Sequence, residues 1–465
     1  MRISLASPMQ SIATLAAALH TVPVAVGAPP AKISGIATDS GEIKRGDLFL
    51  ALRGARHNGN DFIATALSNG AVAVLTEQET APLDGDYWLF RVKSIEQGLL
   101  ALAGARRRLT GAKVVGVSGS TGKTTVKELI AAVLSEAGTV RKSEGNFNST
   151  LGMPLSLLQM EDADYFVLEI GINHPGEMEP LARALAPDLA VLTNVGSAHI
   201  GNFLNAAHLL AEKLKLSAGQ RQSDTILMAD SIARDACLGI PSRILRVGAS
   251  EGADFCLQNI EHGKKGVRAD LRYGARTLKG LCWHMPGSIG LSCLGIGGAV
   301  GMLFGLSEDA VRAGLANAAQ HAPRMNMKHI AGIRMIDDTY NASPEGVITS
   351  LEALAYLGGK GRCAVLGDMG ELGALAEPLH DAVGECAAHS GISHLFTYGN
   401  YSDVMARGAL RGGMTAGCVH AFRFGEETAL AAHILQTVPR GTVVLFKASR
   451  KTALERVIEA LGREG

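Results

Sequence analysis

The chain has 465 residues, which is too long for one hydrophobic core and indicates about three domains of ~150 residues each. Lys and Arg together number 44, as do Asp and Glu, so the balanced charge excludes a general field for nucleic acid or an acidic membrane surface. The 7 cysteines include no CxxC pair, which argues against a disulfide framework or a structural zinc site and favours a reducing, cytoplasmic compartment.

Residues 1–90 alternate short apolar runs with polar turns, which predicts a small α/β domain. An amphipathic first helix would turn Ile12, Leu15 and Leu19 inward. Polar residues interrupt the apolar run at the N-terminus, so a signal peptide is not expected.

The stretch 114–128, VVGVSGSTGKTTVKE, predicts a phosphate-binding loop between a strand and a helix. Gly119 and Gly122 let successive backbone N–H groups point inward, and the start of the helix adds its positive end. The pattern is a short variant, G-x-x-G-K-T, in which Lys123 would neutralise phosphate oxygens and Thr124 would ligate magnesium. An ordinary glycine-rich turn is the alternative. The predicted ATP-binding loop comprises Gly119, Ser120, Thr121, Gly122, Lys123, Thr124 and Thr125.

Residues 91–322 repeat strand and helix signals, which predicts a doubly wound, mostly parallel sheet. Its expected strands are 114–117, 165–170, 189–193 and 225–228. Ligands of such sheets bind beyond the carboxyl ends of the strands. Glu169 ends one apolar run there, where magnesium would compensate its burial, although a core salt bridge is the alternative. His199 follows another strand and shares the expected edge with Glu169 and Thr124, whereas a lone histidine is usually structural.

The 18 uncharged residues 289–306 are long enough for a transmembrane helix. A second span and basic flanks are missing, and the following Ser307 resembles the start of another helix, so we expect a buried helix against a sheet. Cys282 and His284 lack further metal-ligand partners and are expected in the core.

Residues 323–465 contain a new cycle of apolar strands that run into polar turns, which predicts a third α/β domain without a phosphate loop of its own. Placement in turns favours binding over packing. The polar residues of these turns are Asp338, Asn341, Asp368, Glu371, Lys447, Ser449 and Arg450.

These motifs resemble the Mur ligase family over nearly the whole chain. They are SGSTGKTTVKE (118–128), EGNFNSTLGMP (144–154), VLEIGINHPGEM (167–178), TNVGSAHIGNF (193–203), DDTYNASPEG (337–346), LGDMGELG (366–373) and FKASR (446–450). The motifs of the outer domains look most like the branch that joins D-alanyl-D-alanine to UDP-N-acetylmuramoyl-tripeptide.

The resemblance implies an ADP-forming amide ligase of cytoplasmic peptidoglycan synthesis, with ATP and Mg²⁺ as cofactors. The tripeptide carboxylate would become an acyl phosphate, which the dipeptide amine then attacks. Lys123, Lys213 and His199 would be catalytic, with Lys213 carbamylated, and the metal ligands would be Thr124, Glu169 and His199. By composition alone Lys213 is a solvated lysine.

The resemblance also assigns substrate contacts to all three domains. Asn194, Arg324 and Asp338 would contact ATP, and residues 323–465 would close over it. The expected substrate-binding residues are Asp39, Ser40, Asn146, Asn341, Asp368, Glu371, Lys447, Ser449 and Arg450, of which those in residues 1–90 would hold the uridine diphosphate. We expect a monomer with no nucleic-acid partner and no membrane span.

Several positions depart from the family pattern. Gly41 stands in place of an arginine, Ser149 in place of an asparagine, Ile289 in place of a histidine and Cys293 in place of the asparagine expected to face adenine. We therefore expect altered uridine contacts and weaker adenine recognition, and a degenerate homologue that only binds nucleotide stays an alternative. A sister ligase that adds a single amino acid, a folylpolyglutamate synthetase and a GTPase switch are disfavoured by the motifs present and absent.

Overall fold

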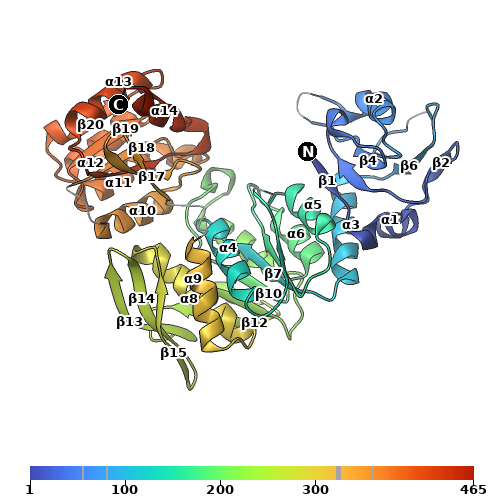
Figure 1. Ribbon diagram of the computed structural model, residues 1–465, viewed down its shortest axis with the longest axis horizontal. Helices are drawn as coiled ribbons and strands as arrows, with labels where there is room; N and C mark the ends of the chain where they lie inside the picture. The colour runs from blue at the N-terminus through green and yellow to red at the C-terminus, as the bar shows by residue number, and fades with distance from the viewer. Residues whose placement is uncertain (55–56, 80–81, 146, 321–325, 358–360, 465) are drawn as a thin grey trace.

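The computed structural model describes residues 1–465 except 55–56, 80–81, 146, 321–325, 358–360 and 465. The described residues form three α/β domains, each built on its own sheet. Figure 1 shows the N-terminal domain at one end, the C-terminal domain at the other and the central domain between them. The predicted α/β class and the three sheets are confirmed.

The N-terminal domain has a six-stranded sheet in the order β1-β3-β4-β5-β6-β2, in which β3 to β6 are parallel and the two edge strands are antiparallel to their neighbours. Leu15 and Leu19 of the first helix are buried as predicted, and Ile12 is partly buried. The elements are β1 (Arg2–Ser4), α1 (Ile12–Leu19), β2 (Val24–Val26), β3 (Gly35–Ala37), β4 (Asp47–Leu50), α2 (Ile63–Ser68), β5 (Ala73–Thr76) and β6 (Tyr87–Arg91).

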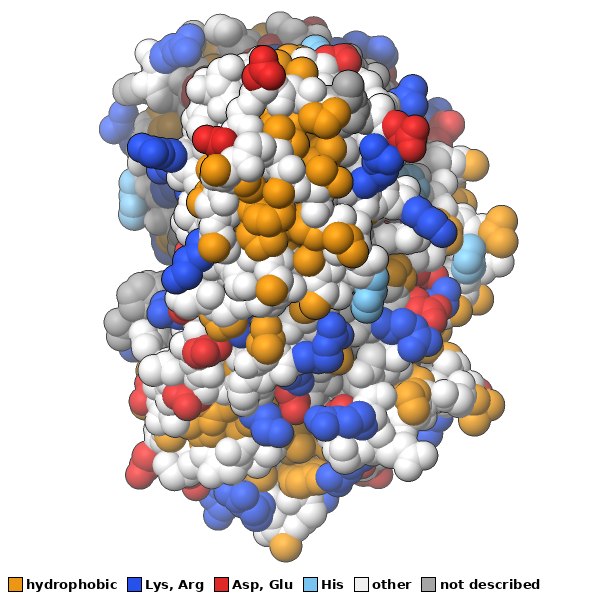
Figure 2. All heavy atoms as spheres, turned by 90° about the vertical axis from the view of Figure 1, so that its right-hand side faces the viewer, with side chains coloured by type: hydrophobic (Ala, Val, Ile, Leu, Met, Phe, Trp, Pro, Cys, Tyr) orange, Lys and Arg blue, Asp and Glu red, His pale blue; other side chains and the backbone are white. Residues whose placement is uncertain are grey.

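Figure 2 shows the face of the molecule on which hydrophobic side chains gather over the N-terminal domain. Val22 and Val24 lie at the edge strand β2 and are 90% and 54% exposed. This domain therefore keeps apolar surface outside its two hydrophobic clusters.

The central domain has a nine-stranded sheet in the order β15-β14-β13-β12-β11-β10-β7-β9-β8. In this order, all neighbouring strands between β8 at one edge and β13 are parallel, as predicted. Strands β13, β14 and β15 form an antiparallel meander that was not predicted. The strands are β7 (Lys113–Ser118), β8 (Val140–Lys142), β9 (Tyr165–Glu169), β10 (Leu189–Leu192), β11 (Thr225–Ala229), β12 (Arg243–Gly248), β13 (Phe255–Gly263), β14 (Gly266–Tyr273) and β15 (Arg276–Trp283). The helices are α3 (Ile95–Leu109), α4 (Lys123–Leu134), α5 (Gly152–Gln159), α6 (Met178–Leu185), α7 (Ala206–Leu214), α8 (Gly287–Leu303) and α9 (Glu308–Gln320).

Helix α8 is the buried helix that the apolar run 289–306 predicts. It packs with α9 and α4, and its glycines let the neighbours approach closely. A Cβ on Gly301 would lie 2.4 Å from a Val311 methyl group, and one on Gly297 would lie 2.9 Å from Leu315. None of the helices that the structure describes has the length and hydrophobicity that a membrane crossing needs.

The expectation that Cys282 and His284 belong to the core is wrong, because both are exposed. Side chains alternate between the two faces of a strand. Leu281 and Trp283 point into the core from β15, so the positions between and after them face outward.

The C-terminal domain has a six-stranded sheet in the order β16-β17-β21-β18-β19-β20, parallel from β17 to β20. The elements are β16 (Asn326–Ile330), β17 (Ile333–Asp338), α10 (Pro344–Tyr356), β18 (Arg362–Gly367), α11 (Ala376–His389), β19 (His394–Tyr398), α12 (Ser402–Arg411), β20 (Val419–Phe422), α13 (Glu427–Thr437), β21 (Val443–Lys447) and α14 (Glu455–Glu464).

Candidate active site

A cavity of about 240 Å³ lies where the carboxyl ends of the central strands meet the loop after β17 of the C-terminal domain. Its walls therefore come from two domains. The predicted residues that line it are Ser120, Thr121, Gly122, Lys123, Thr124, Thr125, Glu169, His199, Asp338, Asn341 and Lys447.

The loop between β7 and α4 has the backbone geometry that the glycines predict. Gly119 has φ 151° and Gly122 has φ 77°, a region that favours glycine. A Cβ on Gly119 would also lie 2.0 Å from Thr193 Oγ1, so the loop packs against the end of β10. Lys123 begins α4, and its Nζ donates to the carbonyl of Gly119 at 2.8 Å. The lysine thus lies over the loop, at the positive end of the helix.

Asn194 supports this loop from the end of β10. Its side-chain oxygen accepts hydrogen bonds from the backbone N–H groups of Ser120 and Thr121 at 3.1 and 2.9 Å. Its amide nitrogen donates to the Thr121 hydroxyl at 2.5 Å. The contact made in the structure is therefore with the loop itself, while the predicted contact with nucleotide stays a prediction.

Glu169 is the end of β9 and is only 3% exposed. Its carboxylate accepts a hydrogen bond from the Thr124 hydroxyl at 2.9 Å and from the Asn148 side-chain amide at 2.6 Å. These described partners are a hydroxyl and an amide rather than the cation of a core salt bridge. A buried carboxylate beside a hydroxyl suits a divalent cation that also binds phosphate oxygens. Sequence reasoning missed Asn148, although it lies in the quoted segment 144–154.

Lys213 is 2% exposed on α7, and its Nζ donates to the Gly119 carbonyl at 3.2 Å. Burial, reinforced by the nearby charge of Lys123, lowers the pKa of Lys213 to about 7. A large fraction of this amine is therefore unprotonated at neutral pH. The solvated position that composition indicates for Lys213 is wrong, because α7 turns this side chain beneath the phosphate-binding loop.

His199 lies in the loop after β10, and its Nδ1 contacts the carboxylate of Glu371 from the C-terminal domain. Burial lowers the pKa of His199, and the charges of Lys123 and Lys213 act in the same direction, whereas Glu371 opposes them. The neutral imidazole that results is the form that binds metal.

Magnesium is compatible with this part of the cavity. Among the described residues, no three His, Cys, Asp or Glu side chains converge on one metal position. Magnesium at a nucleotide needs only one or two protein ligands, because phosphates and waters complete its shell. Thr124 and Glu169 fit that requirement, and His199 lines the same cavity.

The C-terminal domain contributes a buried ion pair to the cavity wall. Lys447 Nζ contacts the carboxylate of Asp338, which also accepts a hydrogen bond from the Ser350 hydroxyl at 3.1 Å. Lys447 also donates to the Asn341 carbonyl at 3.2 Å. The pair therefore places one negative and one positive charge in the cavity wall that faces the phosphate-binding loop.

Several predicted substrate residues lie away from this cavity lining. The Asp368 carboxylate accepts hydrogen bonds from the N–H groups of Asn400 and Tyr401 at 2.9 and 3.0 Å, so it braces a loop. Ser449 contacts the Thr452 hydroxyl at 3.0 Å. The remaining contacts are Arg450 with Glu455 at 3.0 Å, Asp39 with the N–H of Gly41 at 2.8 Å, and the Ser40 carbonyl with the Asn69 amide at 2.9 Å.

Two further predicted residues, Asn146 and Arg324, lie outside the described residues. The substrate roles of all these residues stay predictions.

A second pocket also adjoins the loop and shares Thr121, Gly122 and Ile289 with the first. Asn194, Ile289 and Cys293 line it. Burial raises the pKa of the Cys293 thiol to about 12, so it stays protonated. An apolar side chain and a buried neutral thiol therefore occupy the positions where the family pattern has histidine and asparagine.

The central and C-terminal domains also meet through pairs that the sequence did not reveal. Glu345 accepts hydrogen bonds from the N–H and the hydroxyl of Ser197, both at 2.8 Å. Ser288 contacts Glu352, and the rings of His262 and Tyr356 stack with centroids 4.9 Å apart. Partners such as Ser197 and Glu345 are 148 residues apart, so only the fold reveals them.

Comparisons with known proteins agree with this architecture. Three family models match: "Mur ligase family, catalytic domain" at residues 32–95, "Mur ligase middle domain" at 117–292 and "Mur ligase, glutamate ligase domain" at 323–450. The UDP-N-acetylmuramoyl-tripeptide–D-alanyl-D-alanine ligase of Bacillus subtilis is 30% identical, over 92% of this chain and 93% of that protein. The protein of the same name from Treponema pallidum is 32% identical, over 92% and 94%.

Solved structures agree as well. MurF from Acinetobacter baumannii superposes with a TM-score of 0.87 at 27% identity, over 98% of this chain and 99% of that one. MurF from Thermotoga maritima in complex with ADP gives 0.79 at 29% identity, over 92% and 97%. The chain belongs to the Mur ligase family.

Proposed function

We propose that this chain is an ATP-dependent, ADP-forming ligase that joins D-alanyl-D-alanine to UDP-N-acetylmuramoyl-tripeptide in peptidoglycan precursor synthesis. The observation that carries the proposal is the single cavity that gathers the phosphate-binding loop, Glu169 and His199 with Asp338 and Lys447 of another domain. Relatives of that name align over more than nine-tenths of the chain, which supports the choice of branch.

In the first step, a carboxylate oxygen of the tripeptide attacks the γ-phosphorus of ATP. A new O–P bond forms, the bond from the γ-phosphorus to the bridging oxygen breaks, and ADP leaves. Lys123 neutralises phosphate charge, and the loop N–H groups orient the triphosphate. Thr124 and Glu169 would hold Mg²⁺, which supplies further charge neutralisation when bound.

In the second step, the dipeptide amine attacks the acyl carbon, and phosphate leaves from the tetrahedral intermediate. The acyl phosphate must be kept from water until then. Walls from two domains serve that need, because separation of the domains would open the cavity. We therefore expect slow ATP hydrolysis when D-alanyl-D-alanine is absent.

Lys213 carries a carbamate in the active enzyme under this proposal. Its unprotonated amine attacks carbon dioxide, and loss of one proton leaves a carbamate anion. The lowered pKa and the position beneath the phosphate-binding loop support this role. Partial rescue of Lys213→Ala by short carboxylic acids is the expected outcome, and no rescue at any concentration would contradict the carbamate.

The decisive experiment measures ADP release with each substrate omitted in turn. Turnover that requires both UDP-N-acetylmuramoyl-tripeptide and D-alanyl-D-alanine supports the proposal. Turnover with a UDP-linked dipeptide and a single amino acid would instead identify a sister ligase. Nucleotide binding without turnover would favour the degenerate homologue, which the side chains of Ile289 and Cys293 in the second pocket make the competing candidate.

A monomer in the cytoplasm completes the proposal. The described cysteines are all free thiols, which suits a reducing compartment. The elution volume of the purified chain in size-exclusion chromatography with light scattering tests the monomer.

A further inference from the structure

Two loops interlock across the junction between the central and C-terminal domains. One follows β10 and contains His199 and Gly201, and the other follows β18 and contains Glu371 and Gly373. We call these four residues the clasp. The N–H of Gly201 donates to the carbonyl of Glu371 at 3.0 Å, and the carboxylate of Glu371 contacts Nδ1 of His199.

The backbones of the clasp approach so closely that side chains are excluded at its two glycines. A Cβ on Gly201 would lie 2.5 Å from the backbone nitrogen of Gly373. A Cβ on Gly373 would lie 2.9 Å from the Cα of Gly201. The two loops are therefore shaped for each other rather than brought together by one flexible side chain.

Both of the paired residues have a backbone conformation that is unfavourable for residues other than glycine. His199 has φ 64° and Glu371 has φ 62°, in the left-handed region. Such conformations persist where surrounding contacts enforce them, and they concentrate at functional sites. Here the two residues with unfavourable backbone conformations contact each other across the domain junction, so both conformations occur at the same contact.

The contact decides which nitrogen of His199 is available to a ligand. Nδ1 is engaged by Glu371, while the ring lines the cavity beside Thr124 and Glu169. Carboxylates that hold one imidazole nitrogen orient the other toward a metal ion in many sites. Nε2 is therefore the nitrogen that His199 can offer to a cation.

We propose that Glu371 is a positioning residue that reaches across the domain junction and aims His199 Nε2 at the divalent cation, so that this ligand is in place only when the C-terminal domain is closed. The inference deepens the proposed function and rests on it for the identity of the reaction. It also gives Glu371 a role other than substrate binding, which is the role that the family resemblance implies.

The other junction carboxylates provide matched controls. Glu345 contacts Ser197 and Glu352 contacts Ser288, so each joins the same two domains without touching a histidine. If Glu371 only held the domains together, loss of Glu352 would mimic loss of Glu371. If it orients His199, the two variants differ in metal affinity.

The test titrates the full-length chain with Mn²⁺ by electron paramagnetic resonance, in the presence of a non-hydrolysable ATP analogue. We expect Glu371→Ala to weaken one Mn²⁺ site by roughly 10–100-fold, as loss of an orienting carboxylate usually does. His199→Ala should weaken the same site, and the double variant should bind no more weakly than His199→Ala. Glu352→Gln should leave the affinity within about twofold.

Unchanged Mn²⁺ affinity in a folded Glu371→Ala chain would overturn the proposal, as would additive effects in the double variant. Gly373→Ala offers a second route, because it disrupts the clasp and removes neither side chain. It should weaken the same site, and wild-type affinity would count against the clasp. The substrate-omission assay tests the proposed ligase reaction, and the Mn²⁺ titration tests the role of Glu371 without any turnover. The two proposals can therefore fail separately.

Discussion

The two domain junctions of this molecule differ in the kind of contact that joins the domains. Helix α3 joins the N-terminal and central domains, and its first turns carry Ile95, Leu99 and Leu102 into the N-terminal core. Its last turn carries Arg106, which is fully buried and donates to the Met160 carbonyl at 2.6 and 3.1 Å. One continuous helix thus belongs to the interior of both domains.

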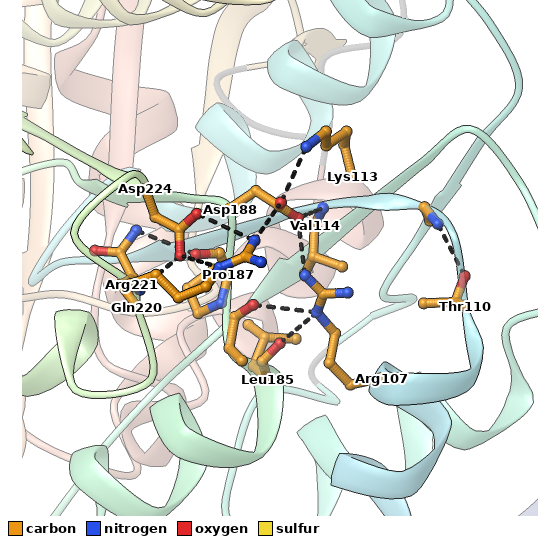
Figure 3. A network of polar contacts seen from close by, with 12 residues as sticks. Arg107, Thr110, Lys113, Val114, Leu185, Pro187, Asp188, Gln220, Arg221 and Asp224 are labelled. Atoms are coloured by element: carbon orange, nitrogen blue, oxygen red, sulfur yellow. Dashed lines mark hydrogen bonds and ion pairs between the residues drawn. The ribbon is translucent and has the colours of Figure 1, made fainter. Parts of the chain in front are cut away.

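Arg107, the next residue of α3, extends this attachment into the central domain. It donates to the carbonyls of Leu185 and Ala186 at the end of α6 and pairs with Asp188 at 2.8 Å (Figure 3). A cation there also suits the negative end of α6. The N-terminal junction therefore behaves as part of a folded core.

The junction with the C-terminal domain combines apolar packing with polar pairs. An apolar cluster continues across it, and polar contacts such as Ser197 with Glu345 and His199 with Glu371 join the two domains. Pairs of this kind can exchange for water at small net cost. The uridine-nucleotide end is therefore expected beside a fixed junction, whereas the junction that completes the cavity is suited to opening.

The largest expected effect separates turnover at the phosphate-binding loop from binding of the UDP-linked substrate by the N-terminal domain. Lys123→Ala should lower turnover by at least about a thousandfold, because phosphoryl transfer depends on neutralised phosphate charge. Binding of the UDP-linked substrate, measured by calorimetry, should stay within about threefold of wild type, since that change is under 1 kcal/mol. Lys113→Ala is the control, because it lies at the opposite end of β7 and is 61% exposed. Equal loss of turnover and substrate binding would contradict the division.

The next effect concerns the fixed junction. Arg106→Ala should lower the free energy of unfolding by about 3 kcal/mol, because it opens a cavity and leaves the Met160 carbonyl without its donor. Urea unfolding followed by the fluorescence of the two tryptophans, Trp88 on β6 and Trp283 on β15, reports this loss. Arg411→Ala removes exposed ion pairs to Asp381 and Glu385 and should lower the free energy of unfolding far less than Arg106→Ala, because solvent screens exposed pairs. Similar losses in both variants would show that the N-terminal junction is not core-like.

Much of the fold could be predicted because its signals are local. The strand that ends at Ser118, the glycine-rich turn and α4 follow one another directly within residues 113–134, which form one βα unit. The run 289–306 indicated a buried helix by its composition. The antiparallel meander was missed although its signals were present, since turns at 263–266 and 273–276 contain glycine and separate three alternating runs.

Only those residues of the site that directly follow strands could be predicted from the sequence. Thr124, Glu169 and His199 share an edge because the strands before them are parallel neighbours, which is a property of the fold class. The lowered pKa of Lys213 depends on burial by distant segments, which no local pattern reveals. The pairing of His199 with Glu371 joins residues 172 positions apart in two domains.

The burial of Lys213 in the central domain, which both junctions share, can be tested through the pH dependence of stability. Its pKa falls from 10.5 to about 7 on folding, so between these values the unfolded chain binds more protons than the folded one. Stability should therefore rise with pH from about 7 to 10.5, by at most about 1.4 kcal/mol per pH unit. Lys213→Met should flatten this part of the urea-derived stability curve measured without bicarbonate. An unchanged slope would contradict the burial of a neutral amine beneath the loop.

The smallest effect concerns the opening junction. Glu345→Gln keeps a hydrogen bond to Ser197 but removes its charge, which should weaken closure by about 1 kcal/mol, a factor of about five. A cavity that opens more often admits water, so phosphate release without D-alanyl-D-alanine should rise about fivefold while unfolding by urea hardly changes. Glu427→Gln is the control, because its carboxylate accepts a hydrogen bond from the Tyr398 hydroxyl within the C-terminal domain. Loss of stability comparable to that of Arg106→Ala, without added phosphate release, would mean that this junction is as fixed as the other.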